Sequence, residues 1–370
     1  LYMKRNFFIV FFILFVTTIF AQQPKSPIFG TIDFVEGTIS VTRANKVITN
    51  INPGDTIFID DFIKTGNDGT VIIQLDKKTG MRGTITIKPK TSAYLRIKQD
   101  ANAPKTIIEV LAGQIQSKLA KISGNPSFSI ATDTAVMGVR GTEFGVVSSP
   151  TGGILVYCTE GAVECSEDGE STVISKGQSV EKKFGERFKK VAVAVSNYET
   201  FAAKWWTDDI EAFRANPAKA LKFYKDKYDE LSKRFNNAFE LLQKSPILTK
   251  WIKEDAERAT INPNSPETLR DKKEIIGHLL EIRKTLVIFE RIYYRMLLLE
   301  DYIKNTSAEK ALLAPGLTVG DFIRRITSEA AAFEKKVALF RYAELLYNLR
   351  NGGTGMFDND NDFFGSSMDS

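Results

Sequence analysis

The sequence is poor in the residues from which most catalytic centres are built. Its 370 residues include one histidine and two cysteines. A usual zinc site takes four protein ligands, or three and a water, which this set does not supply. A Ser/His/Asp hydrolase would have to use His278, which lies in a predicted helix. Neither a Gly-x-Ser-x-Gly elbow nor a Gly-x-x-x-x-Gly-Lys phosphate loop occurs. We therefore expect a protein that is not an enzyme and holds no metal or cofactor.

Positive charge is only slightly in excess, and the one basic cluster is interpreted as a solvated linker, with a contact to anionic glycan or lipid headgroups as the alternative: it consists of Lys182, Lys183, Arg187, Lys189 and Lys190. The chain has 50 Lys and Arg against 45 Asp and Glu, a formal net charge of +5. Binding driven by phosphate neutralisation needs a clustered basic face, so we expect no nucleic-acid partner. Glycoside hydrolysis depends on two carboxylates whose separation no sequence reveals. A cell-wall glycan-active enzyme therefore stays open as a minor alternative.

Long apolar runs are also missing, except at the start. Lys4 and Arg5 precede the apolar run Phe7–Phe20, and Ala21 follows it. The run has 14 residues, whereas a membrane-spanning helix needs about 20. A basic start, a short apolar run and a small residue predict a signal peptide over residues 1–21, cleaved after Ala21. An uncleaved anchor is the alternative. No Cys follows the run for lipid attachment, so we expect a periplasmic or otherwise exported protein with no membrane span after cleavage.

The two cysteines, Cys158 and Cys165, lie seven residues apart. An exported protein meets an oxidising compartment, which allows a disulfide. If Glu160-Gly161 forms a two-residue hairpin turn, Val156 lies opposite Cys165 and the two sulfurs sit on a diagonal. Diagonal neighbours are about 7–8 Å apart, beyond comfortable disulfide reach. A Cys158–Cys165 disulfide and two buried thiols both remain open.

Residues 28–195 have the pattern of an all-β domain. Short β-rich runs recur, each led by glycine, as in Gly83-Thr-Ile-Thr-Ile. Glycine allows turn conformations that other residues avoid, and β-branched residues suit strands. The spacing between these runs is irregular, so no strict repeat is indicated. We expect a β-sandwich or a coiled β fold.

Residues 197–350 have the pattern of long helices. Apolar residues alternate by three and four, which places them on one helix face. Pro217, Pro246 and Pro266 suit first turns of helices. The helix over 267–304 would be about 57 Å long, which predicts an elongated antiparallel bundle. A homodimer through these helices is a further hypothesis. The expected stripes are Leu221, Tyr224, Tyr228, Leu231, Phe235, Ala238 and Leu242, then Ile275, Leu279, Ile282, Leu286, Phe289, Tyr293 and Met296, and last Ile326, Ala330, Phe333, Val337 and Phe340.

Two further segments flank or follow these helices. Trp205-Trp206 begins the helical half, and we interpret the pair as an anchor between domains, with a sugar-stacking surface as the alternative. Residues 351–370 are rich in Gly and Asp and contain no Lys or Arg. This composition predicts a disordered acidic tail.

One motif within the β region resembles a known family. The segment Val139-Arg140-Gly141-Thr142-Glu143-Phe144 resembles the core signature of the FecR domain, and its neighbours agree with the family pattern over about 28–190. The glycines would let backbones approach closely. Arg140 and Glu143 would form a partly buried pair that fixes register. We expect these six residues to have a structural role, with partner binding by Arg140 as the alternative.

The resemblance implies a periplasmic module that senses or relays through protein contacts. The family's best-known members carry a cytoplasmic anti-sigma segment before a single span, and only about six residues precede the apolar run here. We therefore expect no direct control of a sigma factor. The favoured hypothesis is a non-enzymatic binding or scaffold module that contacts a periplasmic or outer-membrane protein, or a cell-wall polymer. An envelope signalling relay is the alternative.

Overall fold

The computed structural model describes residues 28–43, 46–99, 104–120, 127–132, 135–139, 141–167, 169–183, 186–193 and 197–352. The predicted signal peptide with Ala21, the signature residue Arg140 and all but the first two residues of the predicted tail lie outside these ranges.

The first half of the chain forms a two-layer β-sandwich. Its strands are β1 (Ile28–Glu36), β2 (Ile39–Arg43), β3 (Lys46–Ile48), β4 (Thr56–Phe58), β5 (Phe62–Thr65), β6 (Thr70–Leu75), β7 (Arg82–Ile87), β8 (Ser92–Gln99), β9 (Pro104–Ala120), β10 (Ser127–Ala131), β11 (Val136–Val139), β12 (Glu143–Ser148), β13 (Ile154–Glu160), β14 (Ala162–Glu167), β15 (Glu170–Ser175), β16 (Gln178–Lys182) and β17 (Lys189–Ala192).

The long strand β9 belongs to both layers. The first sheet has the order β4-β1-β6-β7-β9-β12-β13-β16-β17. The second has the order β3-β2-β5-β8-β9-β10-β11-β14-β15, in which only β9 and β10 run parallel. β9 changes sheet at Gly113, whose φ is 112°, a value that favours glycine. The chain alternates between layers, so the predicted all-β fold is confirmed as a coiled sandwich.

The two-residue hairpin turn considered at Glu160-Gly161 does not form. β13 pairs with β12 and β16 in the first sheet, whereas β14 pairs with β11 and β15 in the second. Val156 is therefore opposite Val146 and Val180, and Cys165 is opposite Met137 and Thr172. A Glu-Gly step suits a sharp change of direction, and here it carries the chain across the sandwich instead of back along the same sheet.

The second half of the chain contains five described α-helices. They are α1 (Tyr198–Ala215), α2 (Pro217–Gln243), α3 (Pro246–Ala256), α4 (Pro266–Ile303) and α5 (Val319–Arg350), with a small hairpin of β18 (Leu312–Ala314) and β19 (Leu317–Thr318) before α5. Each predicted proline occupies a first turn, and the Ser265 side chain caps α4. Every predicted stripe residue is buried except Ala330, which is half-buried.

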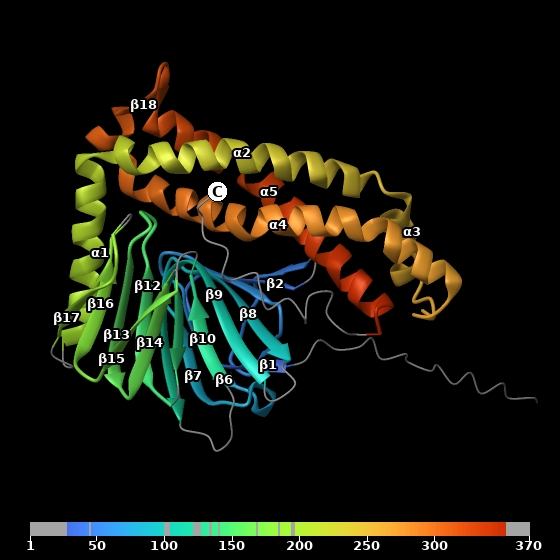
Figure 1. Ribbon diagram of the computed structural model, residues 1–370, viewed down its shortest axis with the longest axis horizontal. Helices are drawn as coiled ribbons and strands as arrows, with labels where there is room; N and C mark the ends of the chain where they lie inside the picture. Colours follow the sequence, from blue (N-terminus) through green and yellow to red (C-terminus); the bar gives the residue numbers. More distant parts are fainter. Residues whose placement is uncertain are drawn as a thin grey trace, which may run out of the picture.

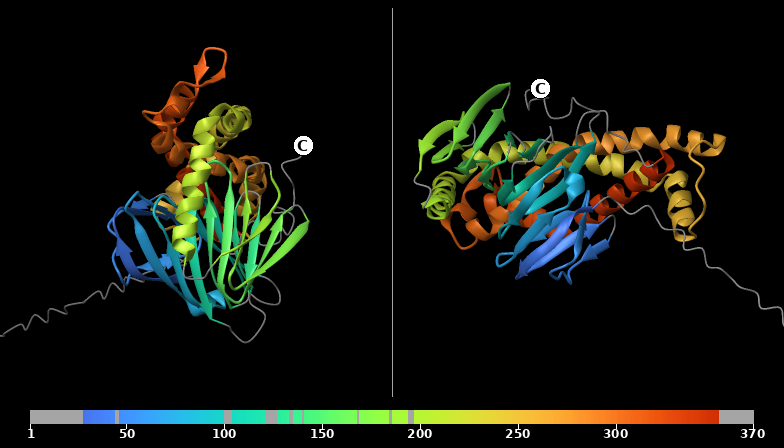
Figure 2. Two further views of the ribbon diagram at one scale, coloured as in Figure 1. Left: turned by 90° about the vertical axis from the view of Figure 1, so that its left-hand side faces the viewer. Right: turned by 90° about the horizontal axis from the view of Figure 1, so that it is seen from below.

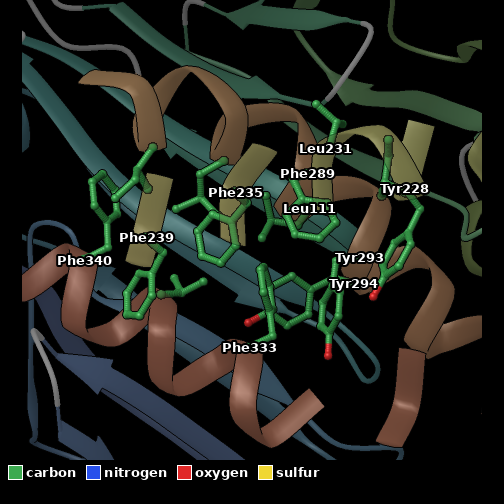
Figure 3. Close-up of a cluster of buried hydrophobic side chains, with 14 of the residues drawn as sticks. Leu111, Tyr228, Leu231, Phe235, Phe239, Phe289, Tyr293, Tyr294, Phe333 and Phe340 are labelled. Atoms are coloured by element: carbon green, nitrogen blue, oxygen red, sulfur yellow. The ribbon is translucent and has the colours of Figure 1, made fainter. Parts of the chain in front are cut away.

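The helices lie against the sandwich and share a core with it. α2 and α4 run side by side across one end of the two sheets, and α1 stands along one side (Figure 1; Figure 2). Phe62, Tyr94 and Leu111 of the second sheet belong to the same hydrophobic cluster as the helix stripes. Figure 3 shows Leu111 beside Phe289 and Leu231, among the aromatic rings of α2, α4 and α5. The helical region therefore buries its apolar face partly on the β region.

Candidate functional site

The signature segment forms a corner at which the chain crosses from one sheet to the other. β11 ends at Val139 in the second sheet and β12 begins at Glu143 in the first. Between them Gly141 has a φ of 63°, in the left-handed region that favours glycine. Gly161, at the return crossing, has a φ of 80°, and a Cβ there would lie 2.6 Å from Thr142 Cγ2. The two crossings therefore pack directly against each other.

The apolar members of the signature face the core. Val139 and Phe144 are buried, and the Phe144 ring meets Phe128 edge-on with centroids 6.4 Å apart. Glu143 points outward, with its carboxylate 3.4 Å from Lys118 Nζ. Its expected partner Arg140 lies outside the described residues. The described signature residues thus have positions that suit a structural corner.

A buried cluster of charged residues lies between the second sheet and helices α4 and α5. Tyr94 Oη of β8 donates to Glu290 Oε1 of α4 at 2.7 Å, and Arg341 Nη2 of α5 donates to Glu290 Oε2 at 2.9 Å. Arg341 Nη1 also donates to Glu344 at 2.9 Å, and Arg283 Nη1 of α4 donates to the other oxygen of Glu344 at 3.1 Å. We call these five residues, with Arg96 and Glu109, the interface network.

Arg96 and Glu109 bring neighbouring strands of the sandwich into this network. Arg96 Nε of β8 lies 3.1 Å from Glu109 Oε2 of β9. The guanidinium groups of Arg96 and Arg341 lie 4.9 Å and 5.0 Å from the centre of the Tyr94 ring. Such contacts strengthen where water is excluded. One tyrosine ring of the sheet therefore contacts a cation from each region of the chain.

Two buried carboxylates of the interface network have pKa values shifted in opposite directions. Burial raises the pKa of Glu290, against the opposing effects of Arg341 and Tyr94. Burial also acts to raise the pKa of Glu109, but the positive charges of Arg96 and Arg291 outweigh it and the pKa is lowered. Burial has the largest single effect on Arg96 and acts to lower its pKa, but Glu109 and the other acidic neighbours together outweigh it and the pKa of Arg96 is raised. Arg96 and Glu109 therefore stabilise each other's charged forms.

A second polar contact fixes the tip of the β12–β13 hairpin beneath α1. Asp209 of α1, which is 7% exposed, accepts hydrogen bonds from the hydroxyls of Ser149 and Thr151. Arg295 Nη2 of α4 donates to Ser148 Oγ at 3.3 Å. A buried carboxylate that receives two hydroxyl donors is satisfied locally, so this cluster holds the hairpin in place.

The tryptophan pair anchors α1 as predicted. Trp205 and Trp206 are buried with Leu155 and Tyr157 in a separate cluster on the outer face of the first sheet. Trp205 Nε1 donates to Glu181 at 2.9 Å, and Trp206 Nε1 donates to the hydroxyl of Tyr302 at 3.0 Å. Because both rings are covered, they offer no stacking surface to a sugar.

The two cysteines are unbonded and fully buried in the structure, one on each sheet. Burial and the neighbouring Cys158 raise the pKa of the Cys165 thiol to about 12, and burial raises that of Cys158. His278 is half-buried on α4. Over the described ranges, His, Cys, Asp and Glu side chains nowhere gather in a group of three or more that would suit a metal ion.

The signature corner and the sandwich residues of the interface network lie in a stretch that matches a known protein family. Residues 61–164 match the family model described as FecR protein. This stretch is a FecR domain. It runs from β5 into β14 and contains the signature corner, Tyr94, Arg96 and Glu109. The interface network therefore joins a FecR domain to helices α4 and α5.

More distant comparisons add little. Two crystal structures of a protein from Parabacteroides distasonis ATCC 8503, described provisionally as an anti-sigma factor, each align with 38% of this chain at 13% identity and a TM-score of 0.27. The aligned part covers 64% and 63% of those chains, less than two thirds of their length. A likeness at this level carries no argument about function. No curated protein matches the chain.

Proposed function

We propose that this protein is a non-enzymatic binding or scaffold protein of the cell envelope. The FecR domain contacts another envelope protein or a cell-wall polymer, and the helical region holds that domain in a fixed orientation. The observation that carries the proposal is the interface network, which ties one end of the sandwich to α4 and α5. Within the described ranges no α-helix lies at the end of the sandwich away from α2 and α4, and we assign the partner to that end (Figure 1; Figure 2).

A place in the periplasm follows from the predicted signal peptide. None of the helices within the described ranges has the length and apolar character needed to cross a bilayer. Fractionation of cells tests this part of the proposal. We expect the protein in the periplasmic fraction, with its first residue at position 22.

A glycan-active enzyme is the weaker alternative. The carboxylates of the interface network are Glu109, Glu290 and Glu344, and each is paired with an arginine. Glu290 is 2% exposed, so a polymer chain does not reach it. A pair of catalytic carboxylates must face the scissile bond from both sides. This arrangement supports a structural use of these charges.

An envelope signalling relay is the second candidate, and the FecR domain itself favours it. A relay predicts that deletion of the gene changes the transcript levels of a defined set of genes. A scaffold predicts envelope defects with unchanged transcription. Sequencing of RNA from the deletion strain separates the two.

Capture from an envelope extract tests the binding proposal. The bait is the purified chain, and two single substitutions compare its two regions. Lys78 is exposed in the short 3-10 helix Lys77–Thr79 between β6 and β7, at the end of the sandwich away from the helices, and Leu241 on α2 is 57% exposed. Since the partner contacts that end, Lys78→Glu should reduce capture of the retained protein or glycan, and Leu241→Ser should not. A folded bait that retains nothing above background, or that loses capture only with Leu241→Ser, contradicts the proposal.

A further inference from the structure

One strand edge of the sandwich is open. β15 is the last strand of the second sheet, and within the described ranges it pairs only with β14. An unpaired edge presents its N–H and C=O groups to any strand that fits. Val173, in the middle of β15, is 50% exposed. The edge thus combines free backbone groups with an exposed apolar side chain.

The hydrogen bonding of Ser175 shows which backbone groups face outward. Its N–H donates to Gln178 Oε1 at 2.9 Å, which marks Ser175 as a residue whose backbone faces away from β14. Residues of an antiparallel strand alternate between the two directions. The N–H and C=O groups of Val173 and Ser171 therefore also face outward, where a further strand would bond to them.

We propose that β15 pairs antiparallel with β15 of a second copy of this chain, about a twofold axis through Val173. In this register Glu170 lies opposite Lys176 of the other copy, and the twofold axis repeats the pair. Both side chains are exposed. Opposite charges across a strand pair are stabilising. The two Val173 side chains meet on the outer face and cover each other.

The charges that this register brings together favour a second copy of the chain as the partner of β15. Registers displaced by two residues place Glu170 opposite Ile174 or Gln178, and neither compensates its charge. The register centred on Val173 therefore satisfies both charges and the apolar residue together. In the single chain Glu170 pairs with Arg187 at 2.8 Å, and both side chains are largely exposed, so this pair yields readily to a new neighbour. The apolar stripes of α2, α4 and α5 are already buried within the chain, which leaves this edge as the better self-association surface.

Sedimentation velocity of the purified chain tests the pairing. A contact made by one strand edge is small, so association is weak and is followed from about 10 µM to about 1 mM. The unsubstituted chain should sediment faster as its concentration rises. Val173→Lys should remove this dependence. Val47→Lys is the matched control, because Val47 is 65% exposed on β3 at the opposite edge of the same sheet.

Charge exchange tests the register. Glu170→Lys and Lys176→Glu should each weaken association about tenfold or more, since each places like charges opposite one another. The double variant should restore it. A monomer at every concentration overturns the proposal, and so does a double variant no better than the single ones.

Cross-linking gives an independent measurement. A hydrogen-bonded antiparallel pair has its Cα atoms about 5.5 Å apart, within disulfide range. Oxidised glutathione should therefore convert Val173→Cys to a covalent dimer. Two thiols, one from each copy, lose their protons and form one S–S bond, and the glutathione disulfide is reduced to two thiols. Cys158 and Cys165 are buried and do not compete. Equal cross-linking of Val47→Cys, or none of Val173→Cys, overturns the proposal and leaves the binding function unaffected.

Discussion

Tyr94 and Glu290 are 196 residues apart in the sequence, yet the phenol of Tyr94 donates a hydrogen bond of 2.7 Å to the Glu290 carboxylate. Tyr94 belongs to the FecR domain and Glu290 to the longest helix. Both side chains are buried, at 4% and 2% exposure. A buried charge is costly unless it is paired, and Arg341 supplies the second partner. The FecR domain is therefore joined to the helices by a buried hydrogen bond to a carboxylate whose charge is paired within the helical region.

Substitution of Glu109 by glutamine should destabilise the protein and change its response to acid. The lowered pKa of Glu109 keeps the folded-state carboxylate charged at pH values where the unfolded chain, with a pKa near 4.5, takes up a proton. Its stabilising contribution is therefore present above about pH 4.5 and is lost as the pH falls through the lower folded-state pKa. Glu109→Gln should cost about 3 kcal/mol at pH 7, because Arg96 loses its partner.

Urea unfolding at pH 7, 5 and 3 measures this effect. The unsubstituted protein should lose more stability over this range than Glu109→Gln. Glu290, whose raised pKa has the opposite sign, is present in both proteins, so the difference reports on Glu109. Parallel pH profiles for the two proteins would show that Glu109 is not held as the structure places it.

Substitutions at two positions of the FecR signature should have very different effects on the free energy of unfolding. Phe144 is 1% exposed against Phe128, so Phe144→Ala should cost about 3–5 kcal/mol of unfolding free energy. Glu143 is partly exposed and meets Lys118 only at the surface, so Glu143→Ala should change stability by less than about 0.5 kcal/mol. Chemical denaturation of both variants checks this difference. A large loss in the Glu143 variant would indicate a buried partner.

Two glycines in consecutive strands of the chain, one in each sheet, form a matched pair. A Cβ on Gly145 would lie 2.2 Å from Tyr157 Cζ, and that ring is stacked on Tyr198 of α1 with centroids 4.9 Å apart. Gly145→Ala should therefore displace α1 and cost about 1–3 kcal/mol. A Cβ on Gly138 meets nothing within 4 Å, so Gly138→Ala should be nearly neutral. Thermal unfolding compares them, and equal stabilities would contradict the close packing of Tyr157.

The cysteines should be reduced and unreactive in the native protein. Both thiols are fully buried and both have raised pKa values, so the reactive thiolate is scarce. Iodoacetamide at pH 8 should modify neither in the folded protein, and should modify both after unfolding without a reductant. Mass spectrometry counts the adducts. No modification after unfolding would demonstrate a Cys158–Cys165 disulfide.

Local patterns in the sequence predicted the parts of the fold that depend on local chemistry. The stripe from Ile275 to Met296 is buried, and Pro266 begins its helix behind the Ser265 cap. Trp205 and Trp206 were predicted to anchor the helical half from their size and their place just after the linker, and both are buried against the first sheet. The order of the strands was not predictable in the same way. Glu160-Gly161 suits a hairpin turn and a crossing between sheets equally well, and the outcome depends on the distant strands β11, β15 and β16.

No local sequence pattern predicted the interface network. In the sequence, nothing distinguishes Tyr94, Arg96 and Glu109 from ordinary residues on the polar face of a strand. Likewise, nothing distinguishes Glu290 and Arg341 from helix residues that face solvent. Their role depends on the docking of two regions separated by about half the chain. A hint was available in Glu290 and Arg291, which interrupt the apolar positions of the helix beside Phe289 and Ile292. Charges in such a place indicate a buried partner elsewhere.

Scanning calorimetry of the purified chain tests most directly whether the FecR domain and the helices are one unit. Since they share a hydrophobic core and the interface network, we predict a single transition whose calorimetric and van't Hoff enthalpies agree. The double variant Tyr94→Phe with Arg341→Met should lower that transition or split it. Two separate transitions in the unsubstituted chain would contradict the account, because the sandwich and the helices would then fold independently.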